Sequence, residues 1–166
     1  MRAIRLRALF AAAALLVPHA SPASEEACVA CDKKVVVSGD FNHARAWGSS
    51  VIQGAPRRGD DAFREEIYGT NFTVTVSGLV PGKYLVQIGE VEVDFANPGE
   101  RSFDIECGDQ LLATNLDIYA AAGGTGKVCF VTSTVDLSGN AAGGPLVLVF
   151  SGNTNAAKFK SIEIKD

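Results

Sequence analysis

The sequence predicts an all-β protein, a sandwich or barrel built from short strands. Apolar and polar residues alternate over several short segments, and glycine-rich turns separate these segments. No segment shows a long 3.6-residue periodicity, a heptad pattern or an internal repeat of about 20–50 residues. About nine short strands with no convincing helix are typical of a two-layer β architecture.

The strands are expected at intervals along most of the chain. The clearest pattern belongs to Phe72, Val74 and Val76, which point one way while the residues between them point the other. A turn at Pro81-Gly82 follows, because proline presets φ and glycine accepts a positive φ at little cost. The expected strands are 33–38, 72–79, 83–95, 102–107, 110–114, 127–137, 145–151 and 158–165, and the segment 116–120 runs into a small-residue corner at 121–124.

One long segment, 39–64, lacks strand periodicity and is broken by glycines and a proline. A loop of this length in a compact domain is usually functional or mobile. It holds the only tryptophan, Trp47, for which packing on the core and contact with a ligand are equally good interpretations. The acidic pairs Asp60-Asp61 and Glu65-Glu66 fit no regular calcium loop, so we interpret them as solvated charges and predict no metal site.

The first 23 residues have the pattern of a secretory signal peptide. Arg2, Arg5 and Arg7 precede an apolar run over 8–17, and Ala23 offers a small residue for cleavage. The run is shorter than the roughly 20 apolar residues of a transmembrane helix, and no later segment qualifies. We therefore expect a signal peptide at 1–23, a short N-terminal segment with a cysteine pair at 24–32, and one domain at 33–166. The mature protein would be secreted, periplasmic or at the cell surface, outside the membrane.

Charge and composition exclude several classes of function. The chain has 15 Lys and Arg residues against 19 Asp and Glu residues, and three of the arginines belong to the leader. This acidic balance argues against nucleic acid or anionic membrane as a partner. His43 is the one histidine beyond the leader, and there is no Gly-x-Ser-x-Gly elbow for a hydrolase triad. The glycines before Lys127 are out of register for a phosphate loop, so no cofactor is predicted.

The chain has four cysteines, at Cys28, Cys31, Cys107 and Cys129. An even number in an exported chain favours disulfides, and three pairings are possible. We prefer Cys107 with Cys129 and Cys28 with Cys31, because Cys107 continues the inner face of its strand, where a bridge between strands could be buried. A redox or zinc site at Cys28 and Cys31 is the less favoured alternative.

A row of carboxylates closes the second clear strand. Glu90, Glu92 and Asp94 alternate with apolar residues and are expected about 7 Å apart on one outer face. Glycosidases place their two carboxyl groups about 5–9.5 Å apart, so this spacing is compatible with catalysis. An acidic outer strand face has the same spacing, and a solvated or ligand-contacting row is therefore the better interpretation.

Several motifs, in order along the chain, resemble the malectin domain family. The resemblance covers 68–164 well and 35–64 poorly. It implies a jelly-roll-like antiparallel β-sandwich that binds glucose-type oligosaccharides through loop aromatics and an acidic residue, without catalysis. The motifs are Ile67-Tyr68-Gly69, Val80-Pro81-Gly82-Lys83-Tyr84, Pro98-Gly99-Glu100-Arg101, Leu116-Asp117-Ile118-Tyr119-Ala120 and Ser161-Ile162-Glu163-Ile164.

The resemblance also implies which residues contact the ligand. The tyrosine that the family places before a main strand falls on Tyr68. The aromatic pair upstream of the Pro-Gly turn falls on Asp94 and Phe95, so its first aromatic is replaced by an acid. The acidic residue before the last strand falls on Asn155. Because two positions differ from the family, the sequence leaves open whether the ligand is a glucan, another glycan or none.

The sequence therefore predicts a non-catalytic carbohydrate-binding module that acts alone or beside other modules. Trp47 or Phe63 is the candidate for a further aromatic contact that the family places earlier in the domain. The alternative from another class is a structural or protein-interaction sandwich with a degenerate sugar site. A weaker alternative is a small glycoside hydrolase that uses Glu90 and Asp94.

Overall fold

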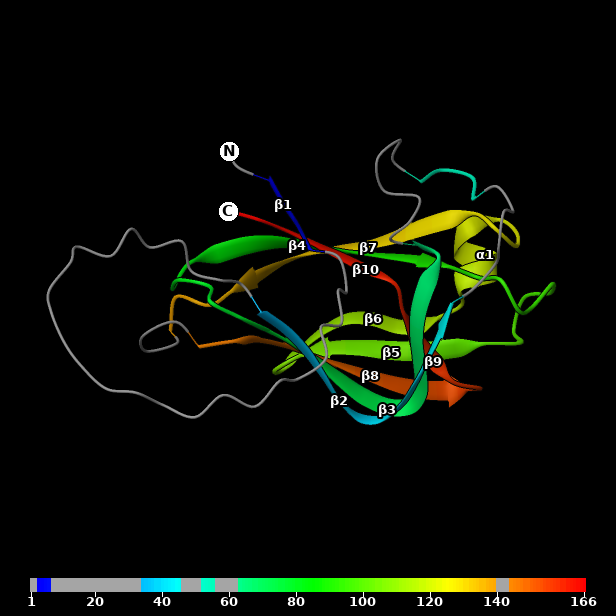
Figure 1. Ribbon diagram of the computed structural model, residues 1–166, viewed down its shortest axis with the longest axis horizontal. Coiled ribbons are helices and arrows are strands. Elements are labelled where there is room, and N and C mark those ends of the chain that lie inside the picture. Colours follow the sequence, from blue (N-terminus) through cyan, green and yellow to red (C-terminus); the bar gives the residue numbers. More distant parts are fainter. Residues whose placement is uncertain (1–2, 7–33, 46–51, 56–62, 140–143) are drawn as a thin grey trace, which may run out of the picture.

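The structure, a computed structural model, describes residues 3–6, 34–45, 52–55, 63–139 and 144–166. Two antiparallel sheets face each other as two layers, and a short helix lies at one end of them (Figure 1). The predicted all-β sandwich is confirmed.

In each sheet, the strands lie in an order that differs from their order along the chain. Sheet A has the order β1 (Ala3–Leu6), β10 (Ser161–Lys165), β4 (Lys83–Val91) and β7 (Val128–Asp136). Sheet B has the order β2 (Lys34–Arg45), β3 (Glu65–Ser77), β8 (Leu146–Thr154), β5 (Ser102–Cys107) and β6 (Gln110–Leu116), and β9 (Ala157–Phe159) pairs with the first part of β3. The predicted last strand is therefore split, because the chain leaves sheet B after β9 and enters sheet A at β10.

The core lies between the sheets and is built from the inward residues of each alternating strand. Phe72 on β3 stacks on Phe150 of β8, with ring centroids 4.8 Å apart. Phe103 of β5 and Phe159 of β9 also contact the Phe150 ring, at 6.4 and 5.6 Å. Aromatic side chains of this size contribute strongly to burial, so this cluster is a large part of the core on the side of sheet B.

A bulge bends β3 where it changes partners. Between the pairs Asp40–Asn71 and Asn42–Tyr68, one residue of β2 faces Gly69 and Thr70 of β3. A Cβ atom at Gly69 would lie 2.0 Å from the carbonyl oxygen of Asp40, so only glycine permits this close approach. Beyond the bulge β3 pairs with β9 instead of β8, which brings Tyr68 beside the chain that follows β8.

Two predicted boundaries were wrong. β2 continues to Arg45, so the first part of the expected 39–64 loop is strand, and β4 ends at Val91 instead of Phe95. Gln53 forms an isolated parallel bridge with Lys127, beside the small apolar cluster of Ile52, Phe63, Val91 and Val93. Trp47 and the pair Asp60-Asp61 lie outside the described residues.

The sequence predicts no convincing helix, yet the segment that runs into the small-residue corner at 121–124 forms a short helix, α1 (Ile118–Ala122). Its N-cap is Asp117, whose Oδ1 accepts a hydrogen bond from the Ala120 N–H at 3.0 Å. Gly123 closes the helix with a φ of 73°. An N-cap aspartate and a C-terminal glycine are ordinary helix signals, and both are present in this segment.

The predicted Cys107–Cys129 disulfide is wrong, because both residues are free thiols in the structure. Cys107 pairs with Gln110 in the β5–β6 hairpin, and the Gln110 side chain donates to Ser133 of β7 at 2.9 Å. Cys129 lies four residues before Ser133 in β7, about 13 Å away along the strand. A disulfide needs Cα atoms within about 4.4–6.8 Å of each other, so the inward-facing pattern alone was not sufficient.

The N-terminal region is described only at 3–6, where β1 pairs with β10. The signal peptide at 1–23 therefore stays a prediction, and Cys28 and Cys31 lie outside the described residues. In the described part of the chain, no helix is long and apolar enough to cross a membrane.

Candidate functional site: a cleft at the end of the sandwich

A cleft of about 400 Å³ lies where three segments meet: the start of β3, the loop after β4, and the turn between β8 and β9. This volume falls within the range of small-ligand sites, about 300–1,000 Å³. Four residues predicted from the sequence, Tyr68, Asp94, Phe95 and Asn155, lie together in this cleft, although their role as ligand contacts is not tested. The remaining lining residues are Ala44, Glu66, Arg101 and Ala156.

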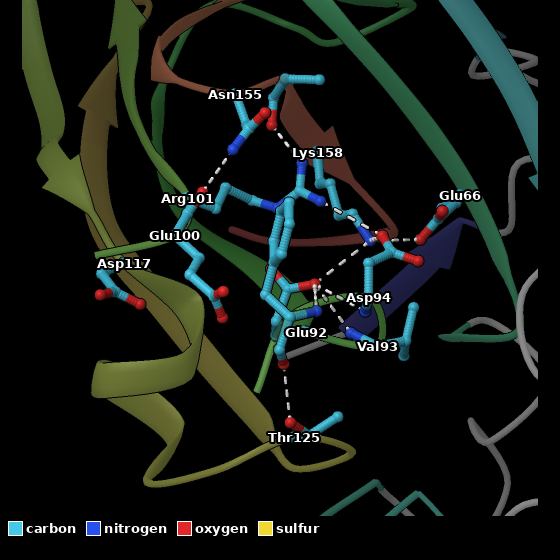
Figure 2. Close-up of polar contacts among 12 residues, drawn as sticks. Glu66, Glu92, Val93, Asp94, Glu100, Arg101, Asp117, Thr125, Asn155 and Lys158 are labelled. Atoms are coloured by element: carbon cyan, nitrogen blue, oxygen red, sulfur yellow. Dashed lines mark hydrogen bonds and ion pairs between the residues drawn. The ribbon is translucent and has the colours of Figure 1, made fainter. Parts of the chain in front are cut away.

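The loop after β4 is held from inside by one buried carboxylate. Glu92 Oε1 accepts hydrogen bonds from the N–H groups of Val93, Asp94 and Phe95, at 3.0, 2.9 and 3.3 Å (Figure 2). The Thr125 hydroxyl donates to the Phe95 carbonyl at 2.7 Å. These contacts satisfy the backbone N–H and C=O groups that would otherwise pair with a neighbouring strand. The chain can therefore leave the sheet after Val91, and the loop that follows places Asp94 and Phe95 in the cleft.

The second half of the same loop is held by two further carboxylates. Glu100 Oε2 accepts from the N–H groups of Ala96 and Asn97, at 3.1 and 2.8 Å. Asp117 Oδ2 accepts from the Gly99 N–H at 2.6 Å. Since Asp117 also caps α1, the loop and the helix share one anchor.

We expect Asp117→Ala to lower the free energy of unfolding by about 1 kcal/mol or somewhat more, because both the helix N-cap and the Gly99 contact are lost. Asp117→Asn is the matched control, since asparagine is also a good N-cap and should lose less. Urea unfolding followed by circular dichroism measures both. Equal stability of Asp117→Ala and the parent chain would contradict the shared anchor.

Arg101 ties the loop to the turn before β9. Its Nε donates to Glu92 Oε2 at 2.7 Å, and its Nη2 lies 3.2 Å from Asp94 Oδ2. Its Nη1 donates to the carbonyl of Ala156. The guanidinium carbon also lies 4.8 Å from the centre of the Phe95 ring, so this cation covers part of one ring face. Arg101 therefore fixes both the acid and the aromatic of the loop.

Lys158 connects the two sides of the cleft from below. This fully buried side chain on β9 bonds Glu66 Oε2 at 3.0 Å and also contacts Asp94 Oδ2 (Figure 2). Lys160 Nζ reaches the same Glu66 oxygen at 2.8 Å. Partial burial acts to raise the pKa of Asp94, but the hydrogen bond and charge of Lys158, with the charge of Arg101, outweigh it and hold that pKa below its usual range. Asp94 is therefore a carboxylate at neutral pH.

Asn155 forms the opposite rim in a left-handed conformation, with φ of 59°. Asparagine tolerates this region better than most residues. Its Nδ2 donates to the carbonyl of Glu100 at 2.6 Å, so the β8–β9 turn and the loop after β4 are joined at the rim as well as below it. Tyr68 lies across from them on β3, half-buried, next to the bulge at Gly69.

The expected acidic outer face at Glu90, Glu92 and Asp94 is wrong. Both Glu90 and Glu92 are 0% exposed, and the Asp94 side chain is 50% exposed. Alternation along β4 already places Glu90 on the inner face with Tyr84, since the two residues are separated by an even number of positions.

Sequence reasoning also missed the cations that hold the cleft. Lys158 lies on the short strand β9 and Lys160 directly follows it; two lysines on either side of a phenylalanine in a predicted strand are the signal in the sequence. In the sequence, Arg101 is distinguished only as part of a motif, Pro98-Gly99-Glu100-Arg101. The prediction of a solvated charge at Glu66 is wrong, because Glu66 is 6% exposed and bound by both lysines.

Fold and site together define a jelly-roll-like β-sandwich domain with a loop-built cleft at one end. The chain belongs to the malectin domain family, whose model matches residues 40–143. The sequence resemblance to this family is thereby confirmed.

Solved structures with the same fold are ectodomains of plant receptor kinases. The extracellular domain of ANXUR2 from Arabidopsis thaliana is 14% identical, with a TM-score of 0.65 over 78% of this chain and 40% of that one. The plant receptor-like kinase FER is 15% identical, with a TM-score of 0.60 over 74% of this chain and 38% of that one. A structure of the plant peptide RALF23 in complex with FER and LLG2 matches at 17% identity, with a TM-score of 0.60 over 74% and 38%.

The chain thus spans about 40% of the length of these ectodomains. At these identities the likeness concerns the fold. No protein with a curated description matches the chain by sequence.

Proposed function

We propose that this domain is an exported, non-catalytic carbohydrate-binding module whose ligand occupies the cleft between Tyr68, Phe95, Asp94 and Asn155. The observation that carries the proposal is the convergence of these side chains, from three separate segments, on one open cleft. Sugars offer apolar C–H faces to aromatic rings and hydroxyl groups to carboxylates and amides. The cleft has both kinds of group.

Asp94 is suited to receive sugar hydroxyls. Lys158 and Arg101 both engage its Oδ2, and no hydrogen bond from the described residues occupies its Oδ1. The side chain is half exposed, so Oδ1 can accept from a hydroxyl without breaking the ion pairs. Because the loop is already held by Glu92, Glu100 and Asp117, little ordering of the backbone is needed on binding.

A glycoside hydrolase is a poorer fit to the geometry. Catalysis by two carboxyl groups requires that both reach the scissile bond. Glu90 is fully buried and does not line the cleft, while Asp94 is bound by two cations. No second acid of the described cleft lining is exposed, since Glu66 is held by Lys158 and Lys160.

Peptide or protein binding is the second candidate function. It is favoured by one observation: a structure of similar fold is a complex of the peptide RALF23 with FER and LLG2. A protein ligand of this domain would place its contacts either in the same cleft or on the sheet faces, and the experiment below separates the two classes of ligand.

The test is a glycan array with the purified chain, followed by calorimetric titration of any glycan retained. We expect Phe95→Ala to weaken binding by about tenfold or more, since loss of an aromatic stacking contact costs about 1 kcal/mol beyond lost area. Tyr68→Ala should act in the same direction. Phe130→Ala is the matched control, because Phe130 is 43% exposed on β7 and packs edge-on against Phe63, outside the cleft lining.

Two results would contradict the proposal. One is the absence of binding to every glycan class on the array. The other is a double variant, Tyr68→Ala with Phe95→Ala, that binds glycan as tightly as the parent chain. Retention of a peptide by the parent chain with no glycan binding would favour the second candidate.

A further inference from the structure

A buried cluster of ionisable side chains lies directly beneath the cleft, and one of its members lacks a partner. Glu90, near the end of β4, is 0% exposed. Within the described part of the chain, neither of its carboxylate oxygens has a hydrogen-bond partner. A buried carboxylate without hydrogen bonds is unfavourable, whereas a neutral carboxylic acid in the same place costs far less.

The charge count of the cluster points the same way. Three of its members, Glu66, Asp94 and Arg101, line the cleft itself. The acids number four and the bases three, so the cluster is balanced when one acid is neutral. The acids are Glu66, Glu90, Glu92 and Asp94, and the bases are Arg101, Lys158 and Lys160.

Several elements around Glu90 contribute a charged or titratable group that faces it. Lys160 follows β9, Lys158 lies on β9, Glu66 on β3, and Arg101 precedes β5. Cys129 is its cross-strand partner on β7. Burial raises the pKa of Glu90 well above its usual range, against the attraction of Lys160 and Lys158. Burial, with the nearby Glu90 charge, raises the pKa of the Cys129 thiol to about 12, so this thiol stays neutral over the range of interest.

We propose that Glu90 is a proton-holding positioning residue. As a neutral acid it leaves Lys158 to bind Asp94 and Glu66 and leaves Lys160 to bind Glu66, and its ionisation draws both lysines away from these partners. Each lysine can direct only three N–H groups, and Lys158 already faces Glu66, Glu92 and Asp94. A new buried carboxylate therefore competes for cations that now hold the cleft. The expected loss of ligand affinity when Glu90 ionises rests on the proposed function. The expected change in the loop after β4 does not depend on that function.

The sign of the pH effect follows from the direction of the shift. Below the usual glutamate pKa, Glu90 is protonated in both folded and unfolded chains and has no effect. Between that value and the raised folded-state value, only the folded chain keeps the proton, so stability falls as pH rises, by a factor of about ten in the unfolding equilibrium per pH unit. Glu90→Gln removes this slope, so the variant is relatively more stable toward neutral and alkaline pH.

The experiment is a pH titration of the whole chain by NMR, with the side-chain carboxyl carbons and the amide groups of Val93, Asp94 and Phe95 as reporters. These amides bind Glu92 Oε1, the oxygen 3.6 Å from Lys158 Nζ, so they sense movement of that lysine. We expect one carboxyl carbon, absent from Glu90→Gln, to titrate well above the usual range, and the three amides to shift with the same midpoint. Glu106→Gln, an exposed change on β5, is the control and should keep both transitions.

A Glu90 carboxyl that titrates in the usual range overturns the proposal, even if Glu90→Gln fails to fold. So do loop amides that shift equally in Glu90→Gln, because the titrating group would then be Lys160, whose pKa burial lowers. Where a glycan ligand is known, affinity should fall over the same pH range in the parent chain and stay level in Glu90→Gln. Absence of glycan binding counts against the proposed function alone, and the amide titration then decides the role of Glu90.

Discussion

Replacement of Arg101 by methionine should lower the free energy of unfolding by about 3–5 kcal/mol, which is the usual cost of removing one partner from a buried ion pair. The change leaves Glu92 fully buried without the Nε–H donor that now lies 2.7 Å from its Oε2. It also removes the bond to the Ala156 carbonyl and the contact with Asp94. For a chain of this size the midpoint of thermal unfolding should fall on the order of 10 °C.

Lys83→Met is the control for Arg101→Met. Lys83 lies 3.6 Å from Asp136, and both side chains are more than half exposed. A surface pair of this kind contributes little, so the control should unfold close to the parent. Denaturant unfolding at several wavelengths measures both variants. Similar midpoints for the two variants would show that the buried ion pair does not hold the loop as we infer.

Gly69→Ala should be the most damaging of the single-methyl additions, with a loss of about 3 kcal/mol or more. A Cβ atom there would lie 2.0 Å from the Asp40 carbonyl oxygen and 3.0 Å from the Phe41 Cα, so backbone must move. The bulge that depends on this approach also directs Tyr68. We therefore expect Gly69→Ala to weaken ligand binding in addition to stability.

Gly82→Ala supplies the comparison for Gly69→Ala. Its Cβ atom would meet only the edge of the Tyr84 ring at 3.9 Å and the Val80 carbonyl oxygen at 4.0 Å, which are ordinary contacts. It should change stability by less than about 1 kcal/mol. The two variants can be compared by calorimetry on the same day and buffer. Comparable losses would mean that the close approach at Gly69 relaxes easily.

The fold could be predicted because the strands of the core follow strict alternation. Phe72, Val74 and Val76 are all buried as the pattern required. A bend at Pro81-Gly82 connects β3 to β4 where a turn was expected, but the positive φ in this connection belongs to Gly78 and not to Gly82. Sheet order could not be predicted this way. The last predicted strand is split at Lys160 because its first part, β9, pairs in sheet B and its second part, β10, pairs in sheet A. Such pairing depends on distant strands, so a local sequence pattern cannot predict it.

The cleft was located through family resemblance rather than composition. Tyr68, Phe95 and Asn155 are far apart in sequence, and no local pattern links them. The resemblance did not predict the buried charged residues that hold these three side chains in place. Buried charges such as Glu92 and Lys158 look like surface residues in a sequence, because only their partners make burial tolerable.

The proposal that this cleft binds glycan is tested most directly by mapping the contact. The isotopically labelled chain is titrated with the glycan that the array retains, while backbone amide resonances are followed by NMR. We predict the largest saturable shifts at Tyr68, Asp94, Phe95, Asn155 and Ala156, with little change at Phe130 and Leu111, which are exposed outside the cleft lining. Shifts centred on those two residues, or no saturable shift with any glycan, would contradict the account.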